Sequence, residues 1–111
     1  MEIEKHTPLR LNEEGYRKLC RLVDERDAGC VICARPATDH HHIIFRSAGG
    51  EDRIENLIAL CREHHMYCAH GEDAKYWRQD FLEAMQHPDA VRFAKSHRKE
   101  LEKIYQMKKR R

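Results

Sequence analysis

The sequence lacks long apolar runs, internal repeats and low-complexity linkers, and it carries little net charge. Its apolar runs extend over only a few residues, whereas a membrane-spanning helix needs about 20, so a bilayer-crossing helix is excluded. No secretory signal peptide is recognisable, and we therefore expect the protein in the reducing cytoplasm. The formal net charge of +2 does not by itself indicate a polyanionic partner, although the last four residues are all basic.

The chain of 111 residues is short enough to form one domain, and its hydrophobic core must be modest. Charged residues make up 36% of the chain, and its mean hydropathy is -0.88. Such a chain needs either well-packed amphipathic helices or a bound metal ion to be stable. We therefore expect residues 1-111 to form a single domain with a metal site.

Cysteine and histidine are concentrated between Cys30 and His70, a segment that holds four of the five cysteines and six of the nine histidines. An odd number of cysteines, arranged in Cys-x-x-Cys and Cys-x-x-His pairs, favours thiolates on a metal over disulfides. Each pair presents two donors from one tight turn, and two such pairs complete a tetrahedral, structural Zn²⁺ site. The predicted zinc ligands are Cys30, Cys33, Cys61 and His64.

The cysteine pattern leaves alternatives open. Cys68 lies about one helical turn beyond His64 and could replace it as the fourth zinc ligand. Cys30 and Cys33 could instead form a redox pair of the thioredoxin kind, but such a pair needs a βαβ context that the sequence does not show. Cys20 falls on the apolar stripe of a predicted helix, which favours burial as a small hydrophobic residue over metal binding.

Helical patterns flank the segment of residues 30-70 on both sides. A helix is expected over 12-27, with Asn12 as its N-cap. C-terminal helices are expected over 73-106, interrupted at His87-Pro88, with one continuous third helix from Asp89 onward.

Two short strands and a helix are predicted inside the segment of residues 30-70. Residues 39-44 suit a strand, in which successive side chains point to opposite faces. His41 and His42 are therefore expected on opposite faces, unless a local twist brings both to the rim of one site. A loop with paired glycines follows, because glycine allows backbone angles denied to other residues. A second strand is expected over 57-60, and a helix from Arg62.

The order of residues in this segment resembles the HNH endonuclease motif. His41-His42 is followed by Gly49-Gly50, then by Asn56, and then by His65 nine positions after the asparagine. The Cys-x-x-Cys and Cys-x-x-His pairs are similar to those of the zinc-braced branch of this family. The resemblance implies an α+β fold with a small ββα-metal core, a hairpin and a helix that clasp one divalent ion. A structural zinc braces this core, and N- and C-terminal helices flank it.

The resemblance also implies roles for individual residues. His42 would be the general base that deprotonates a water, and His41 a ligand of the catalytic metal. Asn56 would bridge the loop by hydrogen bonds so that the His42 ring is correctly aimed. His65 would be the second ligand of the catalytic metal, and His70, five residues later, a candidate third ligand.

These residue types suit phosphodiester hydrolysis independently of the resemblance. The reaction needs a base near neutral pH, which histidine supplies, and positive charge on the phosphorane and the leaving oxygen. We therefore predict a metal-dependent DNA endonuclease that nicks or cuts a duplex, using Mg²⁺, Mn²⁺ or another divalent ion beside the structural Zn²⁺. Arg46 or Arg62 could contact a phosphate or be ordinary surface arginines, and His40 is expected to support the structure or a metal ligand.

Two other functions are compatible with the sequence. One is a non-catalytic zinc module that binds nucleic acid or protein. The other is a thiol oxidoreductase built on Cys30 and Cys33. The DNA target, the preferred catalytic metal and the oligomeric state, including whether the chain forms a homodimer, are left open.

Overall fold

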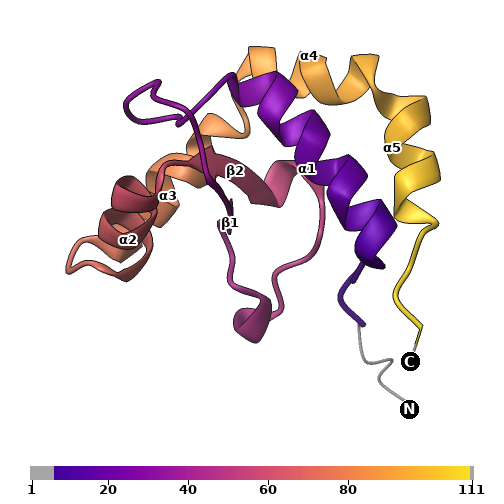
Figure 1. The fold of residues 1–111 in the computed structure, drawn as a ribbon, viewed down its shortest axis with the longest axis horizontal. Helices are drawn as coiled ribbons and strands as arrows, with labels where there is room; N and C mark the ends of the chain where they lie inside the picture. The colour runs from indigo at the N-terminus through magenta and orange to yellow at the C-terminus, as the bar shows by residue number, and fades with distance from the viewer. Residues whose placement is uncertain (1–6, 111) are drawn as a thin grey trace.

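The computed structural model describes residues 7–110, and within them five α-helices surround a two-stranded antiparallel sheet (Figure 1). The α+β class predicted from the sequence is confirmed. The first six residues and Arg111 lie outside the described residues. In chain order the elements are α1 (Glu13–Asp27), β1 (Asp39–His42), the 3₁₀ turns η1 (Arg46–Ala48) and η2 (Ile54–Asn56), β2 (Leu57–Leu60), α2 (Arg62–His70), α3 (Ala74–Ala84), α4 (Pro88–Ser96) and α5 (Arg98–Tyr105).

The sheet lies between two groups of helices. In Figure 1, α1 and α5 lie side by side on one side of the sheet, α2 and α3 lie on the other, and α4 connects the two groups. The segments before α1 and after α5 also meet. Leu11 forms an isolated antiparallel bridge with Lys108, and the Lys109 amide donates to the Arg10 carbonyl at 2.8 Å. The described part of the basic tail is therefore paired with the N-terminal segment.

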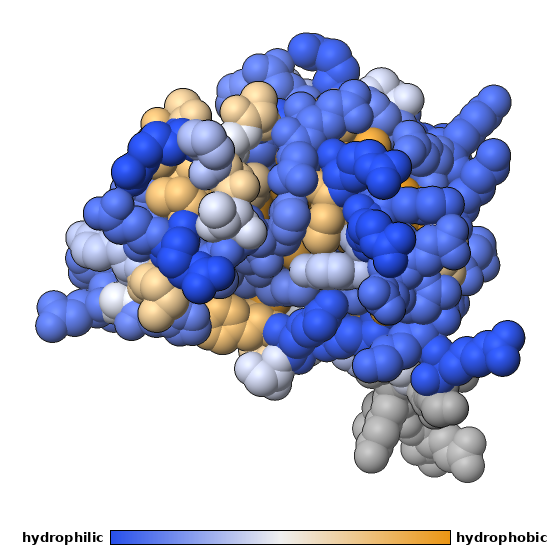
Figure 2. All heavy atoms as spheres, viewed as in Figure 1, coloured by the Kyte–Doolittle hydropathy of each residue, from blue (hydrophilic) through white to orange (hydrophobic). Residues whose placement is uncertain are grey.

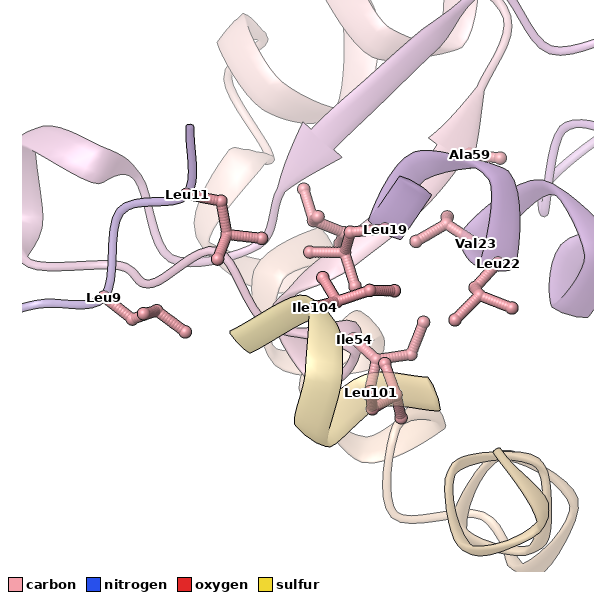
Figure 3. Close-up of a cluster of buried hydrophobic side chains, with 10 residues drawn as sticks. Leu9, Leu11, Leu19, Leu22, Val23, Ile54, Ala59, Leu101 and Ile104 are labelled. Carbon is pink, nitrogen blue, oxygen red and sulfur yellow. The ribbon is translucent and has the colours of Figure 1, made fainter. Parts of the chain in front are cut away.

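Strand β2 is at the centre of the core, because all four of its side chains are buried. Leu57 and Ala59 join the larger hydrophobic cluster with α1 and α5, shown in Figure 3. Ile58 and Leu60 face the other way and pack with Phe81 of α3. Because successive side chains of a strand point to opposite faces, β2 contributes to two hydrophobic clusters, one on each face of the sheet. The other buried members of the larger cluster are Leu9, Leu11, Leu19, Leu22, Val23, Ile54, Leu101 and Ile104.

Strand β1 carries four polar side chains that alternate between the two groups of helices. It pairs with β2 over its whole length. His40 and His42 contact side chains of α1. Asp39 and His41 both contact His65 of α2. The prediction that adjacent histidines of this strand lie on opposite faces is confirmed.

The N-terminal helix begins as the sequence predicts. The Asn12 side chain accepts a hydrogen bond from the Gly15 amide at 2.8 Å and so caps α1. The helix ends at Asp27 because Ala28 adopts the left-handed conformation, with φ of 52°. Cys20 is buried on the inner face of α1, as its position on the apolar stripe indicates.

The prediction of one continuous third helix from Asp89 is wrong, because the structure divides this stretch into α4 and α5 at His97. The Ser96 hydroxyl donates to the Phe93 carbonyl at 2.9 Å, and His97 Nδ1 lies 2.8 Å from the same oxygen. Side chains that bind a backbone carbonyl in this way compete with the helical pattern. The break lets α5 turn and bury Leu101 against α1.

Within residues 7–110 no helix combines the length and the apolar character that crossing a membrane requires.

Candidate functional site

Four ligand atoms from two distant turns of the chain meet at one point. Cys30 and Cys33 come from the turn that follows α1, and Cys61 and His64 come from the beginning of α2. All four ligand atoms lie within 4.8 Å of one another. The Cys33 and Cys61 sulfurs are 3.9 Å apart, and His64 Nδ1 lies 3.2 Å from the Cys61 sulfur and 3.8 Å from the Cys30 sulfur. The four predicted zinc ligands therefore form one cluster that is able to hold a metal ion.

The separations within this cluster fit a tetrahedral zinc ion. With Zn–S bonds of about 2.3 Å and Zn–N bonds of about 2.0–2.1 Å, neighbouring ligand atoms lie roughly 3.6–3.8 Å apart. His64 rather than Cys68 completes the cluster. The Cys68 thiol lies in the smaller hydrophobic core, the cluster of buried side chains that also contains Ile58, Leu60 and Phe81. Burial there raises the pKa of Cys68 to about 11. A set of four protein ligands leaves no coordination position for a substrate, which is typical of a structural site.

Arg35 places a positive charge against the thiols of this cluster. Its Nε donates to the Cys33 sulfur at 3.2 Å, and its Nη2 donates to Glu63 at 3.0 Å. The hydrogen bond from the Arg35 side chain lowers the pKa of Cys33 to about 6. Since the thiolate is the form that binds a metal, this contact favours ligation.

Three imidazole rings lie together on the α2 side of the sheet. The ring centroids of His41 and His65 are 5.0 Å apart, and those of His65 and His70 are 5.8 Å apart. His41 comes from β1 and is buried, whereas His70 is the exposed last residue of α2. The rings meet because α2 begins directly after β2 and packs against the hairpin.

The spacing of His41 and His65 suits a shared metal ion. Two imidazoles bound to one ion through bonds of about 2.0–2.1 Å have centroids roughly 4.5–5.2 Å apart, for octahedral or tetrahedral angles. The centroid distance between His65 and His70 is wider than this range. Among residues 7–110, the cluster of three cysteines and His64 is the one group of three or more such side chains that is placed to hold a metal ion. An ion bound by the histidine group would therefore keep coordination positions that no protein ligand fills, unlike an ion in the zinc cluster.

Asp39, the first residue of β1, supports this histidine group, although the sequence pattern did not single it out. Its Oδ2 atom lies 2.7 Å from His65 Nδ1 and accepts a hydrogen bond from Arg62 Nε at 2.8 Å. The hydrogen bond from Arg62 lowers the pKa of Asp39 to about 2, and His65 adds to the effect. An ionised carboxylate behind a histidine fixes the ring and its tautomer, leaving Nε2 of His65 to bind a metal.

Burial keeps His41 in the neutral form. Its side chain packs edge-on against Phe45 and Phe81, with ring centroids 5.8 and 6.3 Å away. Burial lowers the pKa of His41 to about 4, and the neighbouring histidines and Arg78 add to the shift. His41 is thus unprotonated near neutral pH, which is the state that binds a metal ion.

His42 lies on the other face of β1, against a buried carboxylate. Its Nε2 atom is 2.9 Å from Asp52 Oδ1, and its ring stacks on Tyr16 of α1 with centroids 6.0 Å apart. Asp52 is fully buried, accepts a hydrogen bond from the Leu11 amide at 2.9 Å and pairs with Arg46 at 3.1 Å.

The environment of Asp52 favours its ionised form. Burial acts to raise the pKa of Asp52, but the contacts from His42, the Leu11 amide and Arg46 outweigh burial and lower it. An ionised Asp52 accepts a hydrogen bond from the Nε2–H group of His42, which fixes the tautomer in which Nδ1 carries no hydrogen. The sequence placed Asp52 only in a loop, and nothing in its local pattern indicated this contact with His42.

Asn56 ties the two ends of the loop over residues 45–52 together. Its Oδ1 accepts from the Ile44 amide at 2.9 Å, and its Nδ2 donates to the Ile44 carbonyl at 3.1 Å and the Glu51 carbonyl at 2.9 Å. The glycine pair lets the loop close. Gly49 has a φ of 85°, and a Cβ on Gly50 would lie 1.7 Å from the Ile44 carbonyl oxygen. The loop that contains Asp52 is therefore held in place from both ends.

Replacing Asn56 by alanine is expected to destabilise the protein by about 2 kcal/mol, because it leaves three partly buried backbone groups of residues 44 and 51 without their partner. The free energy of unfolding in urea measures this loss. Asn12→Ala is the matched control, since it removes one hydrogen bond at a helix N-cap and is expected to cost about 1 kcal/mol. Equal losses for the two variants would contradict the bridging role of Asn56.

The remaining candidates belong to the networks around these two histidine sites. The Arg46 side chain is about half exposed and lies over the Tyr16 ring, 5.0 Å from its centroid, beside His42. Arg62 is mostly exposed and holds Asp39 through two hydrogen bonds. His40 Nε2 lies 2.7 Å from a carboxylate oxygen of Asp24, so His40 links β1 to α1.

Comparison with known proteins supports the resemblance seen in the sequence. Residues 30–66 match the family model for HNH endonuclease. The matched segment is about a third of the chain and contains all four ligands of the zinc cluster, both strands, His65 and Asn56. His70 lies beyond it. A search of curated proteins found no match to the chain.

Proposed function

We propose that the protein, whose residues 30–66 match the family model for HNH endonuclease, is a metal-dependent endonuclease that hydrolyses DNA phosphodiester bonds. The observation that carries this proposal is that the two faces of β1 present different histidines. One face of the strand carries His41 beside His65, and the other carries His42 paired with Asp52. Phosphodiester hydrolysis needs a cation site and a base close together, and this strand carries the elements of both.

His41 and His65 are the proposed ligands of the catalytic ion, with His70 as a candidate third ligand. When bound, Mg²⁺, Mn²⁺ or another divalent ion supplies positive charge to the phosphorane and to the leaving oxygen. Asp39 holds the His65 ring, and burial holds His41 neutral. Because few protein ligands are present, room remains for the substrate phosphate.

His42 is the proposed general base. The Asp52 carboxylate accepts a hydrogen bond from the Nε2–H group of His42, so Nδ1 of His42 is the nitrogen that takes the proton of the attacking water. Stacking on Tyr16 fixes the plane of the His42 ring, and Asn56 holds the loop from which Asp52 comes. Arg46 is half exposed beside this pair, and we assign it a contact with the phosphate.

We place the scissile phosphate at the outer edge of β1. The outer edge of β2 is covered, because the Ala59 amide donates to Asp27 at 2.9 Å and its carbonyl accepts from the Val31 amide at 3.1 Å. A phosphodiester that lies across the edge of β1 has the proposed metal ligands on one side and His42 on the other.

The helices outside the matched segment are part of the same proposed nuclease domain. Helix α1 supplies Tyr16 to His42, and α5 packs against α1 in the larger hydrophobic core. None of the five cysteines, all within residues 7–110, is in a disulfide. We propose the reducing cytoplasm as the location, because thiolates remain available to zinc there. Double-stranded DNA is the proposed substrate.

A supercoiled-plasmid assay tests the proposed activity. Adding Mg²⁺ or Mn²⁺ to zinc-replete protein is expected to convert supercoiled plasmid to nicked or linear forms, because the histidine group then gains its ion. His65→Ala is expected to reduce this stimulation at least tenfold. His87→Ala removes an exposed histidine at the beginning of α4 and is expected to leave it unchanged.

A protein that holds one zinc per chain but shows no divalent-stimulated nicking would instead be a non-catalytic zinc module. Chelators do not separate these outcomes, because they remove ions from both sites. The addition of divalent ions to zinc-replete protein does separate them.

A further inference from the structure

A groove of about 850 Å³ lies where the segments before α1 and after α5 meet, and we call it the basic groove. Its walls are residues 7–10, the C-terminal end of α5 and residues 108–110, together with Glu51 and Arg53 of the loop. None of the predicted zinc ligands or catalytic residues lines it. Figure 2 shows mainly hydrophilic side chains on this side of the molecule, beside the chain ends.

The basic groove has an excess of positive charge. Both of its acidic side chains already have basic partners, since Glu51 pairs with Arg53 at 3.3 Å and Glu102 pairs with Arg98 at 3.1 Å. The Arg10 guanidinium donates to the backbone carbonyls of residues 9, 46 and 50, so these contacts leave its charge uncompensated. Its basic lining residues are Arg10, Arg53, Lys108, Lys109 and Arg110.

The backbone of the basic tail is fixed within this groove. The bridge between Leu11 and Lys108 and the hydrogen bond from the Lys109 amide to the Arg10 carbonyl hold it beside the N-terminal segment. The side chains of Lys108 and Lys109 remain exposed to solvent. Within residues 7–110, neither lysine forms an ion pair with a carboxylate, so both ammonium groups remain available to a ligand.

The basic groove and the proposed base share one short piece of chain. Glu51 and Arg53 line the groove, and Asp52 between them turns inward to His42. The Leu11 amide, which lies next to the paired tail, also donates to Asp52. A polyanion bound in the groove therefore lies on the outer side of the segment over residues 51–53, whose middle residue, Asp52, contacts the His42 ring.

We propose that the basic groove binds the phosphate backbone of duplex DNA beside the scissile bond, through Lys108, Lys109 and Arg110. The inference rests on the proposed nuclease function for its choice of ligand. Its physical basis is that a row of uncompensated cations binds a polyphosphate by releasing the counterions of the DNA. Phosphate contacts of this kind position the duplex without reading its sequence.

Binding of a short fluorescein-labelled duplex, followed by anisotropy from about 50 to about 200 mM salt, tests the groove. The protein is zinc-replete, without added divalent ions, and carries His42→Ala so that no cleavage occurs. Adding Lys108→Gln, Lys109→Gln and Arg110→Gln together is expected to lower the slope of log Kd against log salt by about 2–3. Affinity is expected to fall about tenfold or more.

The matched control is Lys95→Gln, Lys99→Gln and Lys103→Gln, which removes the same charge from exposed positions of α4 and α5 outside the basic groove. This variant is expected to change the slope by less than about 1. An equal loss in both triple variants, or an unchanged slope in the tail variant, overturns the proposal. Because binding is measured without cleavage, a groove that fails this test leaves the nuclease proposal standing. If the protein does not cut plasmid DNA, the nuclease proposal fails, but the binding measurement still tests the groove.

Discussion

Replacing His42 by alanine is expected to lower the rate of DNA cleavage by on the order of 10²–10⁴-fold, because no other side chain takes the proton of the attacking water. The fold is expected to survive this change. Asp52, the buried partner of His42, keeps its hydrogen bond from the Leu11 amide and its ion pair with Arg46. The initial rate of plasmid nicking at saturating Mg²⁺ or Mn²⁺ gives the effect on cleavage. Circular dichroism and the zinc content per chain give the state of the fold.

His40→Ala provides the matched control. His40 is on the same strand and the same face as His42, and it contacts a carboxylate of α1 rather than Asp52. Its replacement is expected to leave the cleavage rate within about threefold of the wild type, because it has no partner in the loop that holds His42. A His42→Ala variant that cleaves at the wild-type rate would remove His42 from the mechanism.

Cys30→Ser is expected to release the zinc and unfold the protein. Zinc bound by such ligand sets contributes about 10 kcal/mol or more of apparent folding free energy, which equals the whole stability of a typical small domain. Without the ion, the turn after α1 would no longer be joined to α2 through shared metal–ligand bonds. The smaller hydrophobic core, which includes Cys30, would then open. Zinc content by metal analysis and thermal unfolding followed by circular dichroism measure the two effects.

Cys20→Ser separates loss of the metal from loss of a buried thiol. Cys20 is buried to a similar extent in α1 but lies outside the zinc cluster. It is expected to keep its zinc and to lose only about 1–3 kcal/mol, the cost of a buried hydroxyl in place of a thiol. A folded Cys30→Ser protein that has lost an activity on thiols would instead support a thiol oxidoreductase.

The sequence predicted those features that depend on short spacings. The Cys-x-x-Cys and Cys-x-x-His pairs each define a tight turn, so the ligand set could be named before the turns were seen to meet. Alternation in β1 separated His41 from His42, and the Asn12 cap located the beginning of α1. Each of these predictions needed only local geometry.

Other features depend on contacts between distant segments and could not be predicted in this way. Asp39 and Asp52 are two of many carboxylates in the chain, and only the packed structure selects them as partners of His65 and His42. The helix breaks at His97 because the Ser96 and His97 side chains both bind the Phe93 carbonyl, and because α5 packs against α1 in a different direction from α4. The pairing of Leu11 with Lys108 joins residues almost a whole chain apart, so the charge run at the end of the sequence gave no sign of it.

The alternation of β1 also limits how this hairpin can change in length. Because Asp39 and His41 point to α2 while His40 and His42 point to α1, the parity of each position decides which helix it meets. Inserting or deleting a single residue between Thr38 and Asp39, with the chain before the change held in place, would exchange the partners of all four side chains. A two-residue change would preserve parity but would carry His42 away from the loop that Asn56 closes. Substitutions along this strand alter one contact at a time, whereas a single-residue indel would dismantle the proposed metal ligands and the base together.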